Sequence, residues 1–407
     1  MANQLPQGWK EEELRNIKKF EYINGVSYKP SDAFKVSSGN NTILLRSNNI
    51  EEGNLNLDKV IYVSNHKIQS KQYLKKDDIL IATSSGSKNL VGKSALILDD
   101  TPKTFGAFCG VVRCNNFNAK YVFYYFQSNF YKKYVYNVCK GVNINNLKAS
   151  DLMKLSIPYP TDEKEQKYIV DTLDTVAEMI RLRKETIQLT KDLIPSIFQE
   201  MFGNPITNPK GWPIQKIKEN KNIVSTGRTP PTKYDNMFGG DIPFITPGDL
   251  DNYEIVAERT LTEEGSKYSR LVRKGTTLVG CIGNIGKTNI TKQISAFNQQ
   301  INAIEWNNDF FDDIYGLHLL KALKPIFSSF GGAIVPILNK STFENIDIIR
   351  PPLYLQQEFA AKVEQINQYI AEQQTELEYF ENLFQSLLQE AFTGVLTWNY
   401  PRKENND

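Results

Sequence analysis

The sequence of 407 residues predicts an α+β protein in which a compact domain followed by a long helix occurs twice. Three observations support this prediction: an apolar stripe at helical spacing, its recurrence 190 residues later, and mixed strand and helix signals before each stripe. The expected order is a first domain over residues 1–160, a first helix over 161–203, a second domain over 204–352, and a second helix with a tail over 353–407.

The first long helix is expected from about Glu163 to Phe202. Apolar residues recur there in alternating steps of four and three, which keeps one narrow stripe facing a partner, as in the seam of a coiled coil. Prolines precede the segment and Gly203 follows it, as helix start and stop signals do. A helix of about 40 residues spans roughly 60 Å, the length of a spacer. The predicted seam residues are Ile169, Leu173, Val176, Ile180, Arg183, Ile187 and Ile194.

The second long helix is expected between the proline pair at 351–352 and Gly394. Residues 193–202 align without a gap on residues 383–392, which two unrelated core helices would not do. The predicted seam residues of this helix are Phe359, Val363, Ile366, Ile370, Gln373, Leu377, Phe380 and Phe384.

Three polar or helix-breaking residues interrupt the apolar pattern. Arg183 and Gln373 stand at equivalent seam positions, where a buried polar group fixes the register of the helices, unless the position is a solvated edge of the stripe. Pro195 removes a backbone hydrogen bond and crowds the preceding turn. The first helix should therefore bend or loosen at about 191–195, whereas the second should not.

Each predicted domain opens with a Gly-Trp pair, at Trp9 and at Trp212. Short β-prone runs alternate with turn residues and helical stretches, which is typical of a compact α+β domain. The domain sequences correspond more loosely than the helices do, which suggests one scaffold presenting two different readers. The β-prone runs lie at 79–81, 111–112, 242–245 and 277–279, and the helical stretches at about 120–137 and 312–330.

Composition and charge restrict the class of protein. The sequence has no run of about 18 apolar residues and no signal-peptide core at its start, so a soluble, cytoplasmic protein is expected. The four cysteines form no Cys-x-x-Cys pair and are expected to be reduced. The two domains carry 39 Lys and Arg against 28 Asp and Glu, whereas the helical pieces carry 9 against 18. A phosphate backbone would be attracted to the domains and repelled by the helices, although acidic helix faces are also simply solvated.

Motifs that would indicate catalysis fail in their spacing or context. The Gly-Lys-Ser and Gly-Lys-Thr runs at 92–94 and 286–288 lack the earlier glycine that a phosphate-binding loop requires. Glu165-Gln166-Lys167 falls in the first turns of a helix, where Asp162 and Glu165 suit a capping box rather than a nuclease metal site. With two histidines in the chain, no catalytic residue and no metal site is predicted.

Polar loops hold the candidates for DNA contact. Their amide, hydroxyl and guanidinium groups are those that recognise base edges or hold phosphates, although loops are polar in general. A basic, glycine-rich turn at matching places in both halves is typical of a loop that approaches a nucleic-acid backbone closely. The candidates are Tyr28, Lys29, Arg46, Asn48, Ser85, Ser87, Lys88, Asn89, Lys93, Asn143, Asn145, Thr226, Arg228, Thr229, Lys233, Thr246, Asn284, Lys287 and Gln299.

Several of these segments resemble a known family, the specificity subunit of type I restriction-modification enzymes. Two segments resemble the family's target-recognition domains. They are Ser-Thr-Gly-Arg-Thr-Pro-Pro-Thr-Lys at 225–233 and Gly-Gly-Asp-Ile-Pro-Phe-Ile-Thr-Pro-Gly-Asp-Leu at 239–250. Residues 25–30 with 44–50 resemble another target-recognition subtype. The twice-used proline, glutamine and long helix with a Phe and Gly ending resembles the family's spacers. The second copy has Leu355-Gln356 where Glu-Gln is common.

The resemblance covers essentially the whole chain and implies its organisation and partners. Two target-recognition domains would be held apart by two antiparallel helices that form a coiled coil with approximate two-fold symmetry. Each domain would recognise one half of a split, non-palindromic DNA site, with half-site centres about one helical turn apart. The chain itself would hold no cofactor. Methyltransferase subunits, docked on exposed helix faces, would use S-adenosylmethionine for DNA methylation, and translocase/nuclease subunits would use ATP and Mg for restriction.

Two alternatives belong to other classes of protein. A free-standing DNA-binding regulator could homodimerise through the same helices, and would bind its site tightly without any methyltransferase. An enzyme in its own right, either a nuclease or a methyltransferase, would require the cofactor loop or metal cluster that the sequence lacks.

Overall fold

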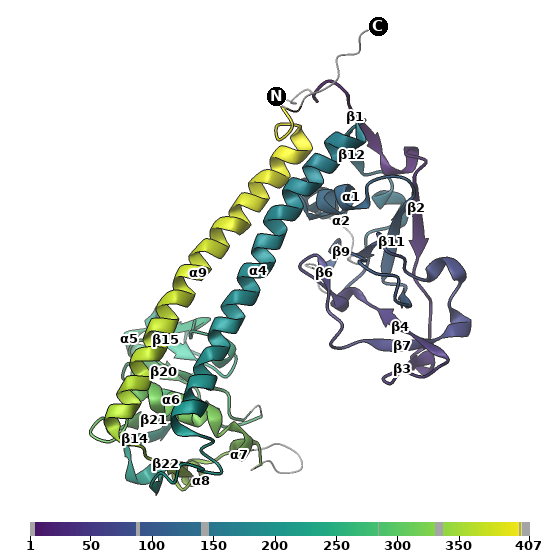
Figure 1. Ribbon diagram of the computed structural model, residues 1–407. Helices are drawn as coiled ribbons and strands as arrows, with labels where there is room; N and C mark the ends of the chain where they lie inside the picture. The colour runs from purple at the N-terminus through teal and green to yellow at the C-terminus, as the bar shows by residue number, and fades with distance from the viewer. Residues whose placement is uncertain are drawn as a thin grey trace. The chain divides into compact units, whose positions relative to one another are not determined.

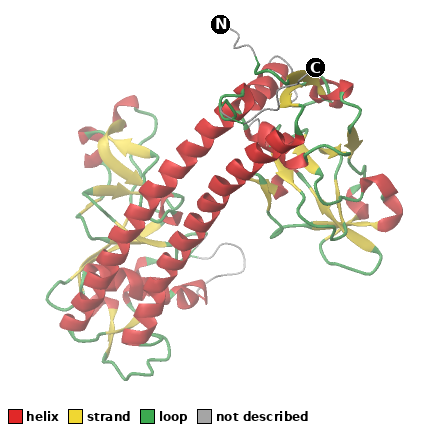
Figure 2. Cartoon of the chain, turned by 45° about the horizontal axis from the view of Figure 1, so that its top comes forward, coloured by secondary structure: helices red, strands yellow, loops and turns green. Residues whose placement is uncertain are grey.

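The computed structural model describes residues 5–86, 90–139, 146–283, 285–329, 337–398 and 400. Contacts between residues divide the chain into two compact units. Unit 1 contains the residues up to Arg183 and those from Glu376 onward, and unit 2 contains Lys184–Thr375. Each unit combines strands and short helices with a part of each long helix, as the red and yellow elements of Figure 2 show. The parts outside the long helices are called domain 1 and domain 2 below.

The two predicted long helices are confirmed as α4, Glu163–Phe202, and α9, Leu353–Thr393. In unit 1, the first turns of α4 share a hydrophobic core with the last turns of α9. In unit 2, the last turns of α4 pack on the first turns of α9, and the ring centres of Phe198 and Phe359 lie 5.5 Å apart. The two helices therefore run antiparallel within each unit (Figure 1). Neither α4, α9 nor any shorter helix within the described ranges has the length and apolar character of a membrane-spanning segment.

All predicted seam residues of α4 and α9 are buried or half-buried. Arg183 forms an ion pair of 2.5 Å with Glu376 of α9. Gln373 is 1% exposed, and neither its amide nitrogen nor its amide oxygen has a hydrogen-bond partner in the described part of the chain. Helix α4 continues through Pro195 without interruption, and the bend expected there stays a prediction.

Domain 1 contains two four-stranded sheets that share a core, and two separate strand pairs. The elements are β1 Trp9–Glu13, β2 Phe20–Asn24, β3 Ala33–Phe34, β4 Asn41–Leu45, β5 Ile50–Glu51, β6 Asn54–Leu55, β7 Ile61–Ser64, β8 Ile79–Ala82, β9 Ser94–Leu96, β10 Lys103–Phe105, β11 Cys109–Cys114, β12 Ser156–Pro160, α1 Ala119–Gln127, α2 Asn129–Cys139 and α3 Ala149–Leu152. The first sheet has the order β2-β11-β8-β9, and the second has the order β10-β4-β7-β3. Strand β1 pairs with β12, and β5 pairs with β6.

Domain 2 repeats the two four-stranded sheets and one of the strand pairs. The elements are β13 Ile214–Lys216, β14 Lys221–Thr226, β15 Phe238–Ile245, β16 Arg259–Leu261, β17 Leu271–Val272, β18 Thr277–Gly280, β19 Thr288–Ile290, β20 Ser295–Phe297, β21 Ile301–Trp306, β22 Asp347–Ile349, α5 Glu263–Lys267, α6 Asp313–Ala322, α7 Lys324–Ser329 and α8 Lys340–Glu344. The sheets have the orders β14-β21-β18-β19 and β16-β15-β20-β17, and β13 pairs with β22. The predicted β-prone runs form β8, β11, part of β15 and β18, and each predicted helical stretch forms two helices.

The two domains match strand for strand in the first sheet and differ in the second. The trio β10-β4-β7 of domain 1 corresponds to β20-β15-β16 of domain 2, with the same parallel and antiparallel pairs. The remaining strand is added at opposite edges, since β3 pairs with β7 whereas β17 pairs with β20. The duplication inferred from the helices therefore extends to the domains, which vary at one sheet edge.

The apolar runs form strands because both faces of the first sheet are covered. In β8, Ile79 and Ile81 face the core shared with α1, α4 and α9, whereas Leu80 and Ala82 face the core shared with the second sheet. The same alternation places Val279 of β18 on the helix side and Leu278 on the sheet side. A strand buried on both faces is apolar throughout, as the sequence shows.

The end of each long helix packs against the proline of the segment that opens a domain. Gly203, at φ +75°, follows α4, and a Cβ added to it would lie 2.9 Å from Cγ of Pro209. Gly394, at φ +76°, follows α9, and an added Cβ would lie 2.3 Å from Cγ of Pro6. The same joint thus occurs in both units.

The tryptophan that follows each proline accounts for one sequence difference between the two spacers, Glu165 in the first and Leu355 in the second. In unit 1, Nε1 of Trp9 donates a hydrogen bond of 3.0 Å to the Glu165 carboxylate. In unit 2, Nε1 of Trp212 donates instead to the backbone oxygen of Phe202, at 2.9 Å. No acceptor is needed at Leu355, the counterpart of Glu165, and Leu355 packs on the core. The Asp162 carboxylate accepts a hydrogen bond of 2.8 Å from Lys164 N in the first turn of α4, and the capping box with Glu165 stays a prediction.

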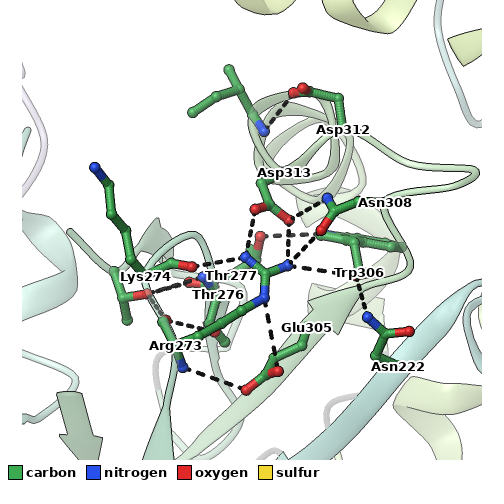
Figure 3. A network of polar contacts seen from close by, with 12 residues as sticks. Asn222, Arg273, Lys274, Thr276, Thr277, Glu305, Trp306, Asn308, Asp312 and Asp313 are labelled. Carbon is green, nitrogen blue, oxygen red and sulfur yellow. Dashed lines mark hydrogen bonds and ion pairs between the residues drawn. The ribbon is translucent and has the colours of Figure 1, made fainter. Parts of the chain in front are cut away.

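An arginine clamps the strands of each domain. In domain 1, Arg113 of β11 donates two hydrogen bonds of 2.7 Å to Asp78, just before β8. In domain 2, Arg273 lies before β18 and contacts both carboxylate oxygens of Asp313 at the start of α6, at 2.7 and 2.9 Å. Figure 3 shows the Arg273 guanidinium between Asp313, Asn308 and the carboxylate of Glu305. These clamps fix the loops that precede the central strands.

Candidate nucleic-acid interface

Four loops of domain 1 meet at one edge, through backbone hydrogen bonds. Val26 N donates to Phe105 O at 2.7 Å, and the amides of Thr83 and Ser84 both donate to Phe108 O, at 2.9 and 3.1 Å. Leu147 N donates to Thr83 O at 2.8 Å, and Ser84 forms an isolated β-bridge with Asn146. We call the loops at 26–28, 83–86, 106–108 and 146–147 the four-loop edge of domain 1.

Domain 2 builds the same edge from loops at 227–229, 281–283, 298–300 and 337–338. Arg228 N donates to Phe297 O at 3.0 Å, Cys281 N to Gln300 O at 2.8 Å, and Leu338 N to Cys281 O at 2.8 Å. An isolated bridge joins Ile282 and Ile337, as Ser84 and Asn146 are joined in domain 1. Because these three backbone bonds and the bridge each have a counterpart in domain 1, the residues of the two edges can be compared position by position.

One glycine allows the close approach of loops in each edge. A Cβ added to Gly25 would lie 2.1 Å from the carbonyl oxygen of Gly106, and one added to Gly227 would lie 2.0 Å from that of Asn298. Neither distance is possible without a backbone shift, since the neighbouring atom is itself backbone. These two positions require glycine because two loops cross there.

The edge of domain 2 gathers several predicted residues. The Thr229 hydroxyl donates to Oε1 of Gln299 at 2.6 Å, and Arg228 is exposed beside them. The Thr226 hydroxyl donates to Oδ1 of Asn302 at 2.8 Å, and the amide of Asn302 donates to Leu338 O. The buried Asn302 was not among the candidates, because an isolated asparagine inside a strand gives no sequence signal.

The edge of domain 1 contains fewer polar side chains in its described part. Tyr28 lies against Gly106, and Ser85 belongs to the loop after β8. Ala107 and Phe108 are exposed, and sequence analysis did not select them because apolar residues do not mark a polar loop. The candidates Ser87, Lys88, Asn89, Asn143, Asn145 and Asn284 lie outside the described residues.

Three further candidates occupy a turn that adjoins each edge. Arg46 follows β4, and its backbone amide donates to Oδ1 of Asn49, at 3.0 Å. Thr246 follows β15, and its amide donates to the Asp249 carboxylate, at 2.6 Å. Asn48 lies in the first of these turns. The two turns correspond, and each is joined to its edge by a backbone bond from the third loop.

The predicted lysines are placed differently from one another. Lys93 and Lys287 occupy equivalent positions in the hairpins before β9 and β19. Lys287 forms an ion pair with Asp251, so a phosphate would have to compete with that carboxylate. Nζ of Lys233 lies 4.9 Å from the ring centre of Tyr234, and Lys29 is exposed.

The chemistry available at the two edges is that of binding. Hydroxyl, amide and guanidinium groups hold phosphates and recognise bases, and no group of His, Cys, Asp or Glu suited to a metal ion occurs within the described ranges. Burial raises the pKa of Cys109 to about 12 and that of Cys281 to about 11. Neither thiol ionises at neutral pH, so neither edge offers a thiolate nucleophile at these positions.

Comparison with known proteins agrees with this arrangement. The family described as type I restriction modification DNA specificity domain matches the chain twice, over residues 6–191 and 209–379. The StySPI specificity subunit of Salmonella potsdam is 25% identical over 435 residues, covering 99% of this chain and 92% of the relative. The EcoKI specificity subunit of Escherichia coli K12 is 30% identical over 206 residues, covering 50% of this chain and 44% of the relative.

Solved structures share the fold. A chain from a structure of type I restriction-modification complex assembly and conformational transition is 20% identical, has a TM-score of 0.59, and covers 97% of this chain and 100% of its own. A type I S subunit from M. genitalium is 15% identical with a TM-score of 0.51, covering 99% of this chain and 98% of its own.

The homodimeric regulator is not favoured, and specificity subunits are the non-catalytic members of their systems. The chain belongs to the family of type I restriction-modification DNA specificity subunits.

Proposed function

We propose that this chain recognises a bipartite, asymmetric DNA site, with each four-loop edge binding one half. The observation that carries the proposal is the duplication of one backbone arrangement with different side chains. Domain 2 places Arg228, Thr229 and Gln299 on its edge, whereas domain 1 places Tyr28 and Phe108 at its own. Two equal frameworks with unequal side chains suit two different half-sites, since base contacts depend on side-chain chemistry.

The long helices would set the gap between the half-sites. Their 40 and 41 residues correspond to about 60 Å of helix. A packed pair of antiparallel helices resists bending better than a loop of the same length, so it suits the role of a spacer. The acidic charge of the helical segments opposes their own binding to DNA.

An exposed apolar stripe on α4 would dock the methyltransferase subunits. Met179, Leu182, Leu189 and Leu193 are 44%, 47%, 61% and 50% exposed. Met179, Leu182 and Leu193 each come one residue before a seam residue, which places them about 100° around the helix from the seam, and Leu189 continues the same spacing between them. A second apolar stripe of this spacing fits a partner helix. Helix α4 would provide the apolar face of this interface, and a helix of the methyltransferase would pack against it.

The remaining chemistry would belong to partner subunits. Methylation requires S-adenosylmethionine, and DNA translocation with cleavage requires ATP and Mg, so these cofactors are assigned to the methyltransferase and restriction subunits. The proposal also places the complex in the cytoplasm, where the DNA is. The chain supplies sequence specificity and a scaffold to both activities.

The proposal is tested by sequencing modified bases in the host genome with and without this gene. Loss of methylation at one bipartite motif on deletion is the expected result, and it identifies both half-sites. Unchanged methylation in a strain that expresses the chain and the methyltransferase would contradict the proposal. Exchanging residues 1–157 for those of a relative with another specificity should then change one half of the motif and leave the other half intact.

A further inference from the structure

Phe108 is an exposed apolar side chain within the four-loop edge of domain 1. It is 69% exposed, the largest value among the phenylalanines that the structure describes. Ala107 beside it is also exposed. Single exposed apolar residues are common on protein surfaces and need no explanation by themselves. The position of Phe108 within the four-loop edge is what calls for one.

The backbone fixes the Phe108 ring in its outward position. The carbonyl oxygen of Phe108 accepts hydrogen bonds from Thr83 N and Ser84 N, at 2.9 and 3.1 Å. Cys109 N donates to Gly106 O at 2.8 Å, which closes a tight turn around Ala107 and Phe108. The flanking Phe105 and Cys109 are 0% and 2% exposed. With both ends of the turn anchored in the core, the ring stays at the surface and loses little freedom on binding.

The equivalent turn of domain 2 carries different chemistry. Gly106 N donates to Leu45 O, and Asn298 N donates to Ile245 O, which aligns residues 106–109 with 298–301. Domain 2 therefore has Gln299 and Gln300 where domain 1 has Ala107 and Phe108. The glutamines take part in hydrogen bonds, with Thr229 and with the amide of Asn298. The turn therefore presents side-chain amides in domain 2 and apolar side chains at the equivalent positions in domain 1.

We propose that Phe108 recognises the methyl group of a thymine in the half-site bound by domain 1. The inference rests on the proposed function, in which this edge faces DNA. In the major groove, the C5 methyl of thymine is the apolar group that distinguishes base pairs, and alanine and phenylalanine are among the side chains that contact it. An exposed Ala-Phe turn has no hydrogen bond to offer through its side chains. Thymine is therefore the base whose chemistry it fits.

The test replaces each thymine of that half-site, one at a time, by deoxyuridine, which removes only the methyl group. The full chain, purified in complex with its methyltransferase subunit, is titrated with each duplex. One replacement should weaken binding by the wild-type chain about four-fold, the value for one methyl group removed from water. The variant Phe108→Ala should bind the original duplex more weakly and show no difference between thymine and deoxyuridine.

Two matched variants serve as controls. Leu98→Ala removes another apolar side chain of domain 1, 67% exposed but outside the four-loop edge, and should leave the four-fold difference intact. Gln300→Ala changes the equivalent turn of domain 2 and should also leave it intact. The conservative variant Phe108→Leu keeps an apolar contact and should keep part of the discrimination.

The outcomes separate this inference from the proposed function. If the wild-type complex binds its bipartite site but does not discriminate thymine from deoxyuridine, methyl recognition is wrong while the proposed function stands. Methyl recognition would also be overturned if Phe108→Ala weakened binding to the thymine and deoxyuridine duplexes by the same factor and so kept the four-fold difference between them. The ring would then contact DNA in another way, such as insertion between base pairs. A wild-type complex with no sequence preference at all would overturn the proposed function itself.

Discussion

Arg113 of β11 and Glu305 of β21 occupy the same position in the two domains and carry opposite charges. Arg113 binds Asp78, which lies just before β8, through two hydrogen bonds of 2.7 Å. Glu305 lies 3.8 Å from Nε of Arg273, which lies before β18. The two domains therefore fasten the same strands with ion pairs of reversed polarity. A positive charge at this strand position attracts Asp78 in domain 1, whereas the same charge in domain 2 would be repelled by Arg273.

Arg113→Ala should destabilise domain 1 strongly. The Asp78 side chain is 1% exposed and would lose its partner. Removing one member of a buried pair costs about 3–5 kcal/mol. Urea unfolding of the variant measures the loss. Lys216→Ala, which breaks the exposed pair with Asp347, is the control and should cost less than about 1 kcal/mol. A loss for Arg113→Ala as small as that of the control would refute the clamp.

Gly25→Ala and Gly227→Ala should each abolish recognition of one half-site. The added Cβ would meet backbone oxygen at 2.1 and 2.0 Å, so the crossing loops must separate and the edge is distorted. Methylation in cells that express each variant with its methyltransferase provides the measurement. Gly39→Ala is the control, because an added Cβ there meets nothing within 4 Å. Normal methylation in both variants would show that neither edge contributes to recognition.

Gln373→Leu should stabilise unit 2. The side chain is 1% exposed and its amide has no hydrogen-bond partner in the described part of the chain, a condition that costs about 1–3 kcal/mol. Leucine fills a similar volume at a seam position without that cost. Thermal unfolding should show a higher midpoint, whereas Gln374→Leu, at an exposed position of the same helix, should not raise it. A lower midpoint for Gln373→Leu would mean that the amide is satisfied.

His318 should make unit 2 sensitive to acid. It lies on α6 with its ring centre 5.4 Å from that of Phe359, and burial, with a smaller contribution from Lys321, lowers its pKa to about 3. The unfolded chain, with a histidine pKa of about 6.5, binds the proton more readily. The contribution is therefore fully present above pH 6.5 and is lost as the pH falls from 6.5 toward 3. At pH 5 the loss is on the order of 2 kcal/mol.

The variant His318→Leu tests this linkage. Its stability should change less between pH 7 and pH 5 than that of the wild type, as measured by urea unfolding at both values. His66→Leu, at an exposed position of domain 1, should leave the difference unchanged. An equal acid loss in wild type and His318→Leu would assign the sensitivity to other groups.

Leu189→Glu should prevent the methyltransferase from docking. Leu189 is 61% exposed on the second apolar stripe of α4, so the substitution leaves the seam intact and places a charge in the proposed interface. Binding to the methyltransferase should weaken by at least about ten-fold, as for a central interface residue. Gln374→Glu, an exposed change on α9 outside the stripe, should bind normally. Wild-type affinity in Leu189→Glu would place the interface elsewhere.

The elements that local periodicity determines could be predicted from the sequence. The seam of α4 and α9 repeats within each turn of helix, and the buried strands β8 and β18 are apolar because both of their faces are covered. Signals of this kind need only neighbouring residues. The resemblance of the 225–233 and 239–250 segments added the family, which local patterns do not supply.

The interface was predictable in part, because it depends on contacts between distant residues. Thr229 and Gln299 were selected separately, and only the fold brings their side chains to 2.6 Å. Phe108 was missed because its exposure follows from the turn that holds it. Lys287 was selected for its charge, which an ion pair with Asp251 already engages. Whether a polar residue faces solvent or a partner is set by packing, which its own sequence neighbourhood does not encode.

The contact between Pro6 and Gly394 closes unit 1 in the way that the contact between Pro209 and Gly203 closes unit 2. In unit 2 a continuous backbone passes through this joint, whereas in unit 1 the two sides of the joint belong to opposite ends of the sequence. The order of domain and helix is consequently cyclic, and the same architecture would result from a chain opened at residues 204–208 and joined between Gly394 and Pro6.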